Sequence, residues 1–465
     1  DADPEAPTPP PRKRASLVQV ILAICLGLLV IVTAALAAAR FGVQIPMVRQ
    51  MIEARAEGLK IGRMGRLHLE GVEGDIWRDT TVRRLTIADA KGVWLEARDL
   101  RLVWRYPELF QRRFHAERIT AREVRILRRP VMGPAGKPGG GMPVSVRIDA
   151  LQARLEMAPA FSYRRGVYDV RAGLNIERSG RRAGQVAAAS QLHPGDRLDL
   201  NFDIGKGQPV LLKADAAEAQ GGALAGALGL PADQVFRLHI DAKGDASQGR
   251  FTADAVSGAG KPLWARGGWA PGGGQAAGRL DLSASRLTAD IARRLGAEVI
   301  FAGAGRKSSG PEGFALDLRA SSANLNLTAK GFGDIGKRRT APQGLLIEAA
   351  SGDLSKIGAG PMKGPARVTG RLAGDAAAWR FKGQATAGGF ATGGYSLAKI
   401  SGPIDVSRKD GAFEVATTLQ GAGGAGKGYA AAILGGAPRA SLAAARLKDG
   451  RLLVRDLDVL GRGLK

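Results

Sequence analysis

The sequence predicts a mainly β protein, in which an N-terminal transmembrane helix is followed by an elongated, curled antiparallel-like β-sheet groove with few short helices. Three observations predict this taco-shaped fold class. From Gly62 onward, apolar and polar residues alternate in short runs that are separated by Gly-rich turns, which is an all-β signal. Glycine supplies 66 of 465 residues, about twice its average usage, while aromatic residues supply only 5%. Residues 17–39 carry no charge.

The uncharged stretch predicts a transmembrane signal-anchor helix at residues 16–39. A helix over 17–39 runs roughly 34 Å, which is enough to cross a hydrocarbon core of roughly 30 Å. Arg12, Lys13 and Arg14 precede it, so the tail at 1–15 is expected in the cytoplasm and the bulk of the chain across the membrane. Two alternatives are a cleaved secretory signal and a buried core helix.

A short amphipathic helix is expected next, within a juxtamembrane segment at residues 40–60. Pro46 suits a first helical turn and Gly58 suits a stop. The apolar stripe of this helix consists of Met47, Val48, Met51 and Ile52. The stripe either lies at the membrane surface or caps the first sheet strands.

The strand pattern divides into a first β-groove module at 61–129, a Gly/Pro loop at 130–143 and continued β-groove repeats at 144–465. The alternation slips its phase near residues 97–99, as a β-bulge would cause. Helical turns are expected at 106–113, 221–230 and 287–295. A compact sandwich and an open trough both fit this pattern. The single Cys, Cys25, lies inside the membrane stretch, so the exported part has no disulfides; this, with few aromatics and a sustained strand pattern, favours the trough.

The net charge of +25 first suggests nucleic acid as a partner. The basic residues, however, are spread along the chain and are not interleaved with stacking aromatics, so no nucleic acid is expected. They form a solvated strand face, or they attract anionic lipid headgroups or acidic polymers.

No catalytic, metal or cofactor site is expected, and the chain is not predicted to be an enzyme. Gly421–Gly428 resembles a phosphate-binding loop, but Gly428 stands where Ser or Thr would bind magnesium. His68 and His239 alternate with apolar residues and belong to polar strand faces.

The chain is similar to the N-terminal portion of the TamB family (the translocation and assembly module inner-membrane subunit), within the AsmA-like, bridge-like lipid transfer group. The resemblance rests on the anchor, on GRLHLEGVEG (65–74), VRRLTIADA (82–90), GVWLEA (92–97), DLRLVW (99–104) and ITAREVRILRRP (119–130), and more loosely on GALGLPA (226–232). It implies a single-pass protein of the cell inner membrane whose periplasmic β-groove has an apolar interior. It also implies a fragment, because family members are far longer than 465 residues.

The resemblance implies that the protein carries phospholipid between the inner and outer membranes and supports outer-membrane protein assembly and secretion. The implied partners are phospholipids, the inner membrane, and a BamA-like outer-membrane barrel, TamA, which would dock through a C-terminal region absent here. One alternative is a scaffold or chaperone that presents β-barrel clients without lipid transport; another is a cleaved, surface-displayed adhesin. The residues expected to line the groove and contact lipid are Leu67, Leu69, Leu85, Ile87, Val93, Leu95, Leu100, Leu102, Val124, Ile126, Val146, Ile148, Phe202, Leu238, Leu316 and Leu318.

Overall fold

The computed structural model describes residues 59–463 apart from residues 62, 76, 134–143, 206–208, 309–312, 335–336, 359–361, 393, 410 and 449. The predicted tail, the transmembrane helix at 16–39 and the stripe of Met47, Val48, Met51 and Ile52 lie outside the described residues, as does most of the loop at 130–143. Across the part that is described, no helix is both long and apolar enough to span a bilayer.

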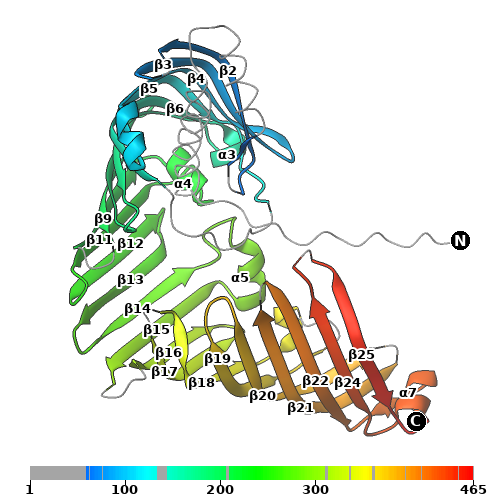
Figure 1. The fold of residues 1–465 in the computed structure, drawn as a ribbon. Coiled ribbons are helices and arrows are strands. Elements are labelled where there is room, and N and C mark those ends of the chain that lie inside the picture. Colours follow the sequence, from blue (N-terminus) through cyan, green and yellow to red (C-terminus); the bar gives the residue numbers. More distant parts are fainter. Residues whose placement is uncertain are drawn as a thin grey trace, which may run out of the picture. The chain divides into compact units, whose positions relative to one another are not determined.

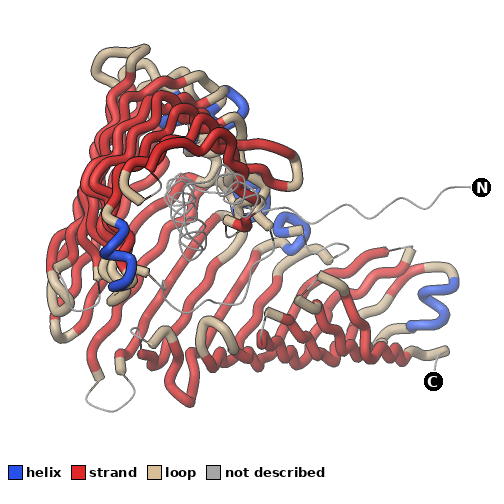
Figure 2. Tube along the Cα trace, turned by 45° about the horizontal axis from the view of Figure 1, so that its top comes forward, coloured by secondary structure: helices blue, strands red, loops and turns tan. Residues whose placement is uncertain are grey.

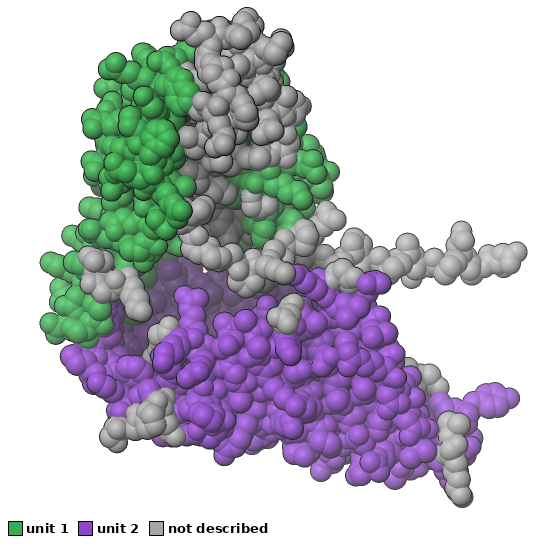
Figure 3. Space-filling view, viewed as in Figure 1, with its two compact units in different colours: residues 1–261, 284–287 green, residues 262–283, 288–465 purple. Residues whose placement is uncertain are grey.

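The described chain is mainly β, with one long mixed sheet and a few short helices, as the sequence predicts. Its residues fall into two compact units (Figure 3). Unit 1 comprises Asp1–Lys261 and Ala284–Leu287, and unit 2 comprises Pro262–Ser283 and Thr288–Lys465. Within each unit the strands follow one another side by side in chain order, except that the short β23 pairs with β21 and β22 pairs with β24 (Figures 1 and 2).

In its described residues, unit 1 contains twelve strands and three short helices. Each strand pairs with its neighbours, so the twelve strands form one sheet. Its strands are β1 (Leu59–Lys60), β2 (Arg66–Asp75), β3 (Asp79–Asp89), β4 (Gly92–Trp104), β5 (Arg113–Ile126), β6 (Ser145–Met157), β7 (Gly166–Ile176), β8 (Arg182–Ser190), β9 (Arg197–Ile204), β10 (Val210–Glu218), β11 (Phe236–Gly244) and β12 (Gly249–Ser257). Its helices are η1 (Tyr106–Gln111), α3 (Pro159–Ser162) and α4 (Ala223–Ala227).

Unit 2 continues the same hairpin pattern. Its strands are β13 (Gly260–Ala270), β14 (Gly273–Asp281), β15 (Glu298–Lys307), β16 (Phe314–Ser322), β17 (Asn326–Asp334), β18 (Arg339–Ser351), β19 (Ala366–Gly374), β20 (Trp379–Thr392), β21 (Tyr395–Lys409), β22 (Ala412–Ala422), β23 (Ala425–Gly426), β24 (Arg439–Arg446) and β25 (Leu452–Leu460). Its helices are α5 (Ala289–Leu295), α6 (Leu354–Ile357) and α7 (Tyr429–Leu434).

The sheet is mixed because β5 and β6 run parallel, whereas the other paired strands described here run antiparallel. Parallel neighbours require a connection that returns the chain to the same end of the sheet. The Gly/Pro-rich segment between Ile126 and Ser145 is long enough to do this, so it acts as a crossover and not as a simple hairpin loop.

The predicted phase slip is present at Asp99. This residue has a left-handed φ of 49°, and its carboxylate lies 2.7 Å from Arg122 Nη2. Because of this local kink, Ala97 and Leu100 are both buried although two residues lie between them, a spacing that would put them on opposite faces of a regular strand. The pairs on either side of Asp99 keep the same register with β3 and with β5, so the left-handed residue, and not an inserted one, lets the apolar residues of β4 remain on one face of the sheet.

The helical turns expected at 106–113, 221–230 and 287–295 are present as η1, α4 and α5, while α3, α6 and α7 were not predicted. Leu59 and Lys60, the last residues of the expected juxtamembrane segment, pair with Leu67 and Arg66 as strand β1.

The main hydrophobic core lies in unit 1. It is built from one face of β2–β7, and Phe161 of α3 and Leu224 of α4 belong to the same buried cluster. Trp94, fully buried, donates from Nε1 to the carbonyl of Met64 at 2.8 Å. In unit 2, the described helices have no buried residue, so the two faces of its sheet are covered far less.

Candidate functional site: an apolar face of the sheet

Residues that pair directly across strands point to the same face of a sheet, so the register assigns each side chain to a face. We call the face that contains Leu67 and Leu69 the apolar face of unit 1, and the opposite face its charged face. One continuous row on the apolar face crosses β2 to β12 through Val72, Val82, Leu100, Ala121, Ala153, Val170, Ala188, Leu198, Ala216, Leu238 and Ala255. This row contains no polar side chain.

Unit 2 has an apolar face of its own. A row from β13 to β25 runs through Gly267, Ala276, Gly303, Leu318, Ala329, Ile347, Gly370, Gly383, Ile404, Thr417, Leu442 and Leu457. A parallel row contains Leu316, Leu345, Leu372, Phe381, Val406, Val415, Ala444 and Val454. With neighbouring strands about 4.8 Å apart, a row across twelve strands extends roughly 50 Å without a charge.

All but one of the predicted lining residues lie on the apolar face of their unit. The exception is Val93, which was assigned to the wrong face. A bulge between Ile87 and Ala88 makes Val93 pair with Ala88, while Leu95 pairs with Ile87. The extra residue is Trp94, which is buried in place of Val93, and Val93 is left 37% exposed. Simple alternation counted back from Leu95 could not reveal this inserted position.

The two units differ in how their apolar faces meet solvent. Leu67, Leu95 and Leu102 of unit 1 are almost completely buried. In unit 2, Leu318 is 41% exposed and Leu457 is 65% exposed. The apolar face of unit 2 is therefore a solvent-accessible hydrophobic surface, which monomeric proteins rarely present over such a length unless it binds something.

Glycines flatten this surface. A Cβ at Gly278 would overlap Cζ of Phe301, which lies across the ladder, and would lie 2.9 Å from its Cε1. A Cβ at Gly370 or Gly383 would lie 2.6 or 2.9 Å from Cζ of Phe381. The large side chains thus lie over backbone where a neighbouring side chain is missing. The strand periodicity predicted the face but not this pairing, because it joins residues that are far apart in sequence.

A buried carboxylate fixes α4 beside the apolar face of unit 1. Glu218, fully buried, accepts hydrogen bonds from Tyr168 Oη at 2.7 Å and from the backbone N–H groups of Leu224 and Ala225 at 2.8 Å each. Burial, followed by the charge of Glu218, raises the pKa of the Tyr168 hydroxyl strongly, so this hydroxyl stays a donor. Sequence reasoning missed Glu218, because it sits at the end of an apolar strand with no motif around it.

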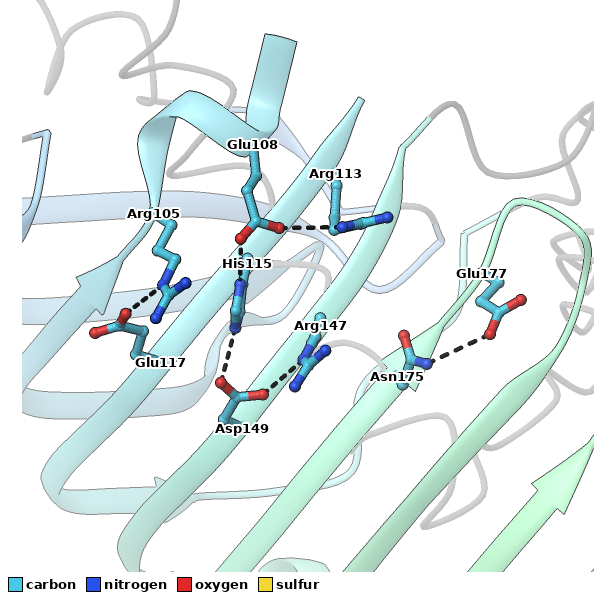
Figure 4. A network of polar contacts seen from close by, with 9 residues as sticks. All are labelled: Arg105, Glu108, Arg113, His115, Glu117, Arg147, Asp149, Asn175 and Glu177. Atoms are coloured by element: carbon cyan, nitrogen blue, oxygen red, sulfur yellow. Dashed lines mark hydrogen bonds and ion pairs between the residues drawn. The ribbon is translucent and has the colours of Figure 1, made fainter. Parts of the chain in front are cut away.

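A network of ion pairs stabilises the charged face of unit 1 (Figure 4). The two ring nitrogens of His115 lie 2.7 Å from Glu108 Oε1 and 2.7 Å from Asp149 Oδ2, so both bonds form only with a doubly protonated ring. The hydrogen bond from His115 lowers the pKa of Glu108. Burial alone would raise the pKa of Asp149, but hydrogen bonds from Arg147 and His115 outweigh it and lower this pKa.

The charged face also has a polar hollow of about 540 Å³ within unit 1. Its lining combines Asp149, Asp199 and Asp215 with Arg171 and Lys213, so neither sign of charge dominates. Among the residues that the structure describes, no group of three or more His, Cys, Asp or Glu side chains is placed to hold a metal ion. The phosphate-loop-like Gly421–Gly428 spans the end of β22, the short β23 and the turn before α7.

Comparison with known proteins found no matching family model, no matching curated protein and no matching solved structure.

Proposed function

We propose that this chain is an inner-membrane-anchored, periplasmic β-groove protein of the TamB type, which carries phospholipid between the inner and outer membranes and supports outer-membrane protein assembly. In this proposal the acyl chains lie on the apolar face of the sheet, and the headgroups remain in water. The proposal extends the family resemblance of residues 15–130 to the whole chain.

The observation that carries the proposal is the uninterrupted apolar face of unit 2. Its central row, from Gly267 to Leu457, crosses twelve strands without a charged residue, and its leucines remain partly exposed. Covering such a face with an acyl chain removes apolar surface from water, which contributes about 0.8 kcal/mol per CH₂ group. Because similar Leu, Ile, Ala and Gly side chains recur along the rows, no position binds a chain much better than the next, which favours movement along the face.

Two matched substitutions test this proposal. Leu318→Asp places a charge on the apolar face, whereas Leu346→Asp places the same charge on the opposite face, where Leu346 pairs with Lys330 and Arg371. The two leucines are similarly exposed, at 41% and 37%. The full chain would be purified from membranes, and its bound phospholipid would be extracted and quantified by mass spectrometry. We expect Leu318→Asp alone to lose most of its lipid; equal lipid in both variants would refute the proposal.

A scaffold that presents outer-membrane strands is the second candidate function. Strand β25 favours it, because β25 pairs with β24 on one side and with no other strand in the described residues. A free edge can add a client strand through main-chain hydrogen bonds. Photocrosslinkers at Leu318 and at Leu457 would separate the two functions: lipid adducts support transport, whereas polypeptide adducts support the scaffold.

A further inference from the structure

The apolar face of unit 2 has two different margins. At the edge formed by the starts of β20 and β22 and the ends of β21 and β24, one row runs Trp379–Arg408–Phe413–Arg446. We call this row the basic margin. One position further in, the row Phe381–Val406–Val415–Ala444 has no charge.

At the opposite margin of the same face, the described row has no cation. There the row through β19, β20, β21 and β22 consists of Ala366, Ala387, Ile400 and Gly421. The many other Lys and Arg residues of these strands, such as Lys382 and Lys399, lie on the charged face. The cations on the apolar face are therefore confined to one side, although the chain as a whole is strongly basic.

The basic margin is held in place by its aromatic members. Trp379 and Phe413 pack edge to face with ring centroids 6.2 Å apart, and Cζ of Arg408 lies 5.4 Å from the Phe413 ring centroid. The Nε–H of Arg408 is buried and has no hydrogen-bond partner among the described residues, while its Nη1 donates to the carbonyl oxygen of Ala376 at 3.4 Å. Neither Arg408 nor Arg446 makes an ion pair with a described residue, whereas Arg380 on the charged face is paired with Asp405.

From this asymmetry we propose that the basic margin binds the phosphate of phospholipids with a net anionic headgroup while their acyl chains lie on the adjacent rows. This inference rests on the proposed function and specifies its substrate class and orientation. Guanidinium groups bind phosphate oxygens with charge-assisted hydrogen bonds, and aromatic rings suit the boundary between an apolar and a wet region. The face changes from apolar in the row of Phe381 and Val406 to cationic in the adjacent basic margin. This change matches the boundary between the acyl chains and the headgroup of a lipid.

Lipid selection by the purified full chain tests the inference. The protein would be incubated with vesicles of equal dioleoyl-phosphatidylglycerol and dioleoyl-phosphatidylcholine, reisolated, and its lipids quantified by mass spectrometry. We expect about fivefold enrichment of phosphatidylglycerol, the scale of one or two cations beside an anionic headgroup. In Arg408→Gln/Arg446→Gln, the enrichment should disappear while the total lipid stays unchanged. Replacing both residues by Lys should restore most of the enrichment.

The matched control is Lys399→Gln/Lys409→Gln, which removes the same charge from the opposite face of β21 and should keep the enrichment. If the double variant fails to fold, Arg446→Gln alone tests the inference, because Arg446 is exposed and its replacement disturbs no packing. Equal enrichment in wild type and margin variants would overturn the inference and leave transport intact. Phosphate buffer should lower the enrichment more than chloride of equal ionic strength, because inorganic phosphate competes for the same guanidinium groups; an equal effect of the two anions would count against phosphate recognition. If no variant and no wild type retained lipid, the proposed function would fall as well.

Discussion

The substitution Gly278→Ala tests whether glycines opposite large side chains shape the apolar face of unit 2. Gly278 has no left-handed backbone conformation, so alanine meets no strain in φ. Its Cβ would, however, overlap Cζ of Phe301 and lie 2.7 Å from the carbonyl oxygen of Trp264, where ordinary contacts are about 3.5–4.0 Å. The ring can tip away, but the backbone carbonyl cannot move without disturbing the ladder between β13 and β14.

Overpacking of this kind typically costs about 1–3 kcal/mol. Alanine also stiffens the unfolded chain, which returns about 0.4–1 kcal/mol, so we expect a net loss of roughly 1–2 kcal/mol in stability. The control is Gly303→Ala on the same face. There the new Cβ would lie 2.9 Å from Cδ2 of Leu318 alone, and this flexible methyl can rotate away. We expect Gly303→Ala to change stability by no more than about 0.5 kcal/mol.

Hydrogen exchange measured by mass spectrometry on peptides from β14 and β15 suits this comparison, because stability in a stack of strands is largely local. Exchange should be faster in Gly278→Ala than in wild type and unchanged in Gly303→Ala. Adding Phe301→Ala to Gly278→Ala should recover part of the protection, because it removes the ring contact. Unchanged exchange in Gly278→Ala, or equal effects of the two alanines, would refute the reasoning.

Two further predictions concern unit 1. Glu218→Gln should lower the free energy of unfolding by about 2–4 kcal/mol. The single amide oxygen cannot accept hydrogen bonds from Tyr168 and from both backbone N–H groups, and the amide NH₂ would face one of these donors. Urea unfolding measures the loss, and adding Tyr168→Phe to this variant should lower its stability little further. The pKa values of Glu108 and Asp149 are lowered, so their stabilising contribution is present above about pH 4.5 and is lost as pH falls through the folded values. Urea midpoints at pH 6 and pH 3.5 should therefore differ less in His115→Gln than in wild type, and an equal difference in both would contradict the role of His115.

The mainly β class, the apolar rows and the slip at Asp99 could be predicted, because a period of two is a local property of the sequence. The bulge that buries Trp94 and turns Val93 outward could not, since it depends on the register with β3. The parallel pairing of β5 with β6 depends on the route of a Gly/Pro-rich connection that has no periodicity. The overlap of Phe301 with Gly278 joins strands whose register the sequence does not show.

The basic margin could not be predicted for a related reason. Arg408 and Arg446 resemble the many other basic residues of the chain when they are read along the sequence. Only the register shows that they share a face with Phe413 and Val415, whereas Lys399 and Lys409 do not. A strand two residues longer or shorter would move each of them along the face, so the margin is a property of aligned hairpins.

In the described part of unit 2, each strand from β14 to β20 pairs along its length with its immediate predecessor and successor in the chain. Contacts of this kind close short loops, so the ladder has a low contact order for a β protein and can form one hairpin at a time. Gain or loss of a whole hairpin would change the length of the ladder by about 10 Å and would leave the strand pairing on either side intact. Such an architecture can change its length by duplicating or deleting hairpins, without redesign of a central core.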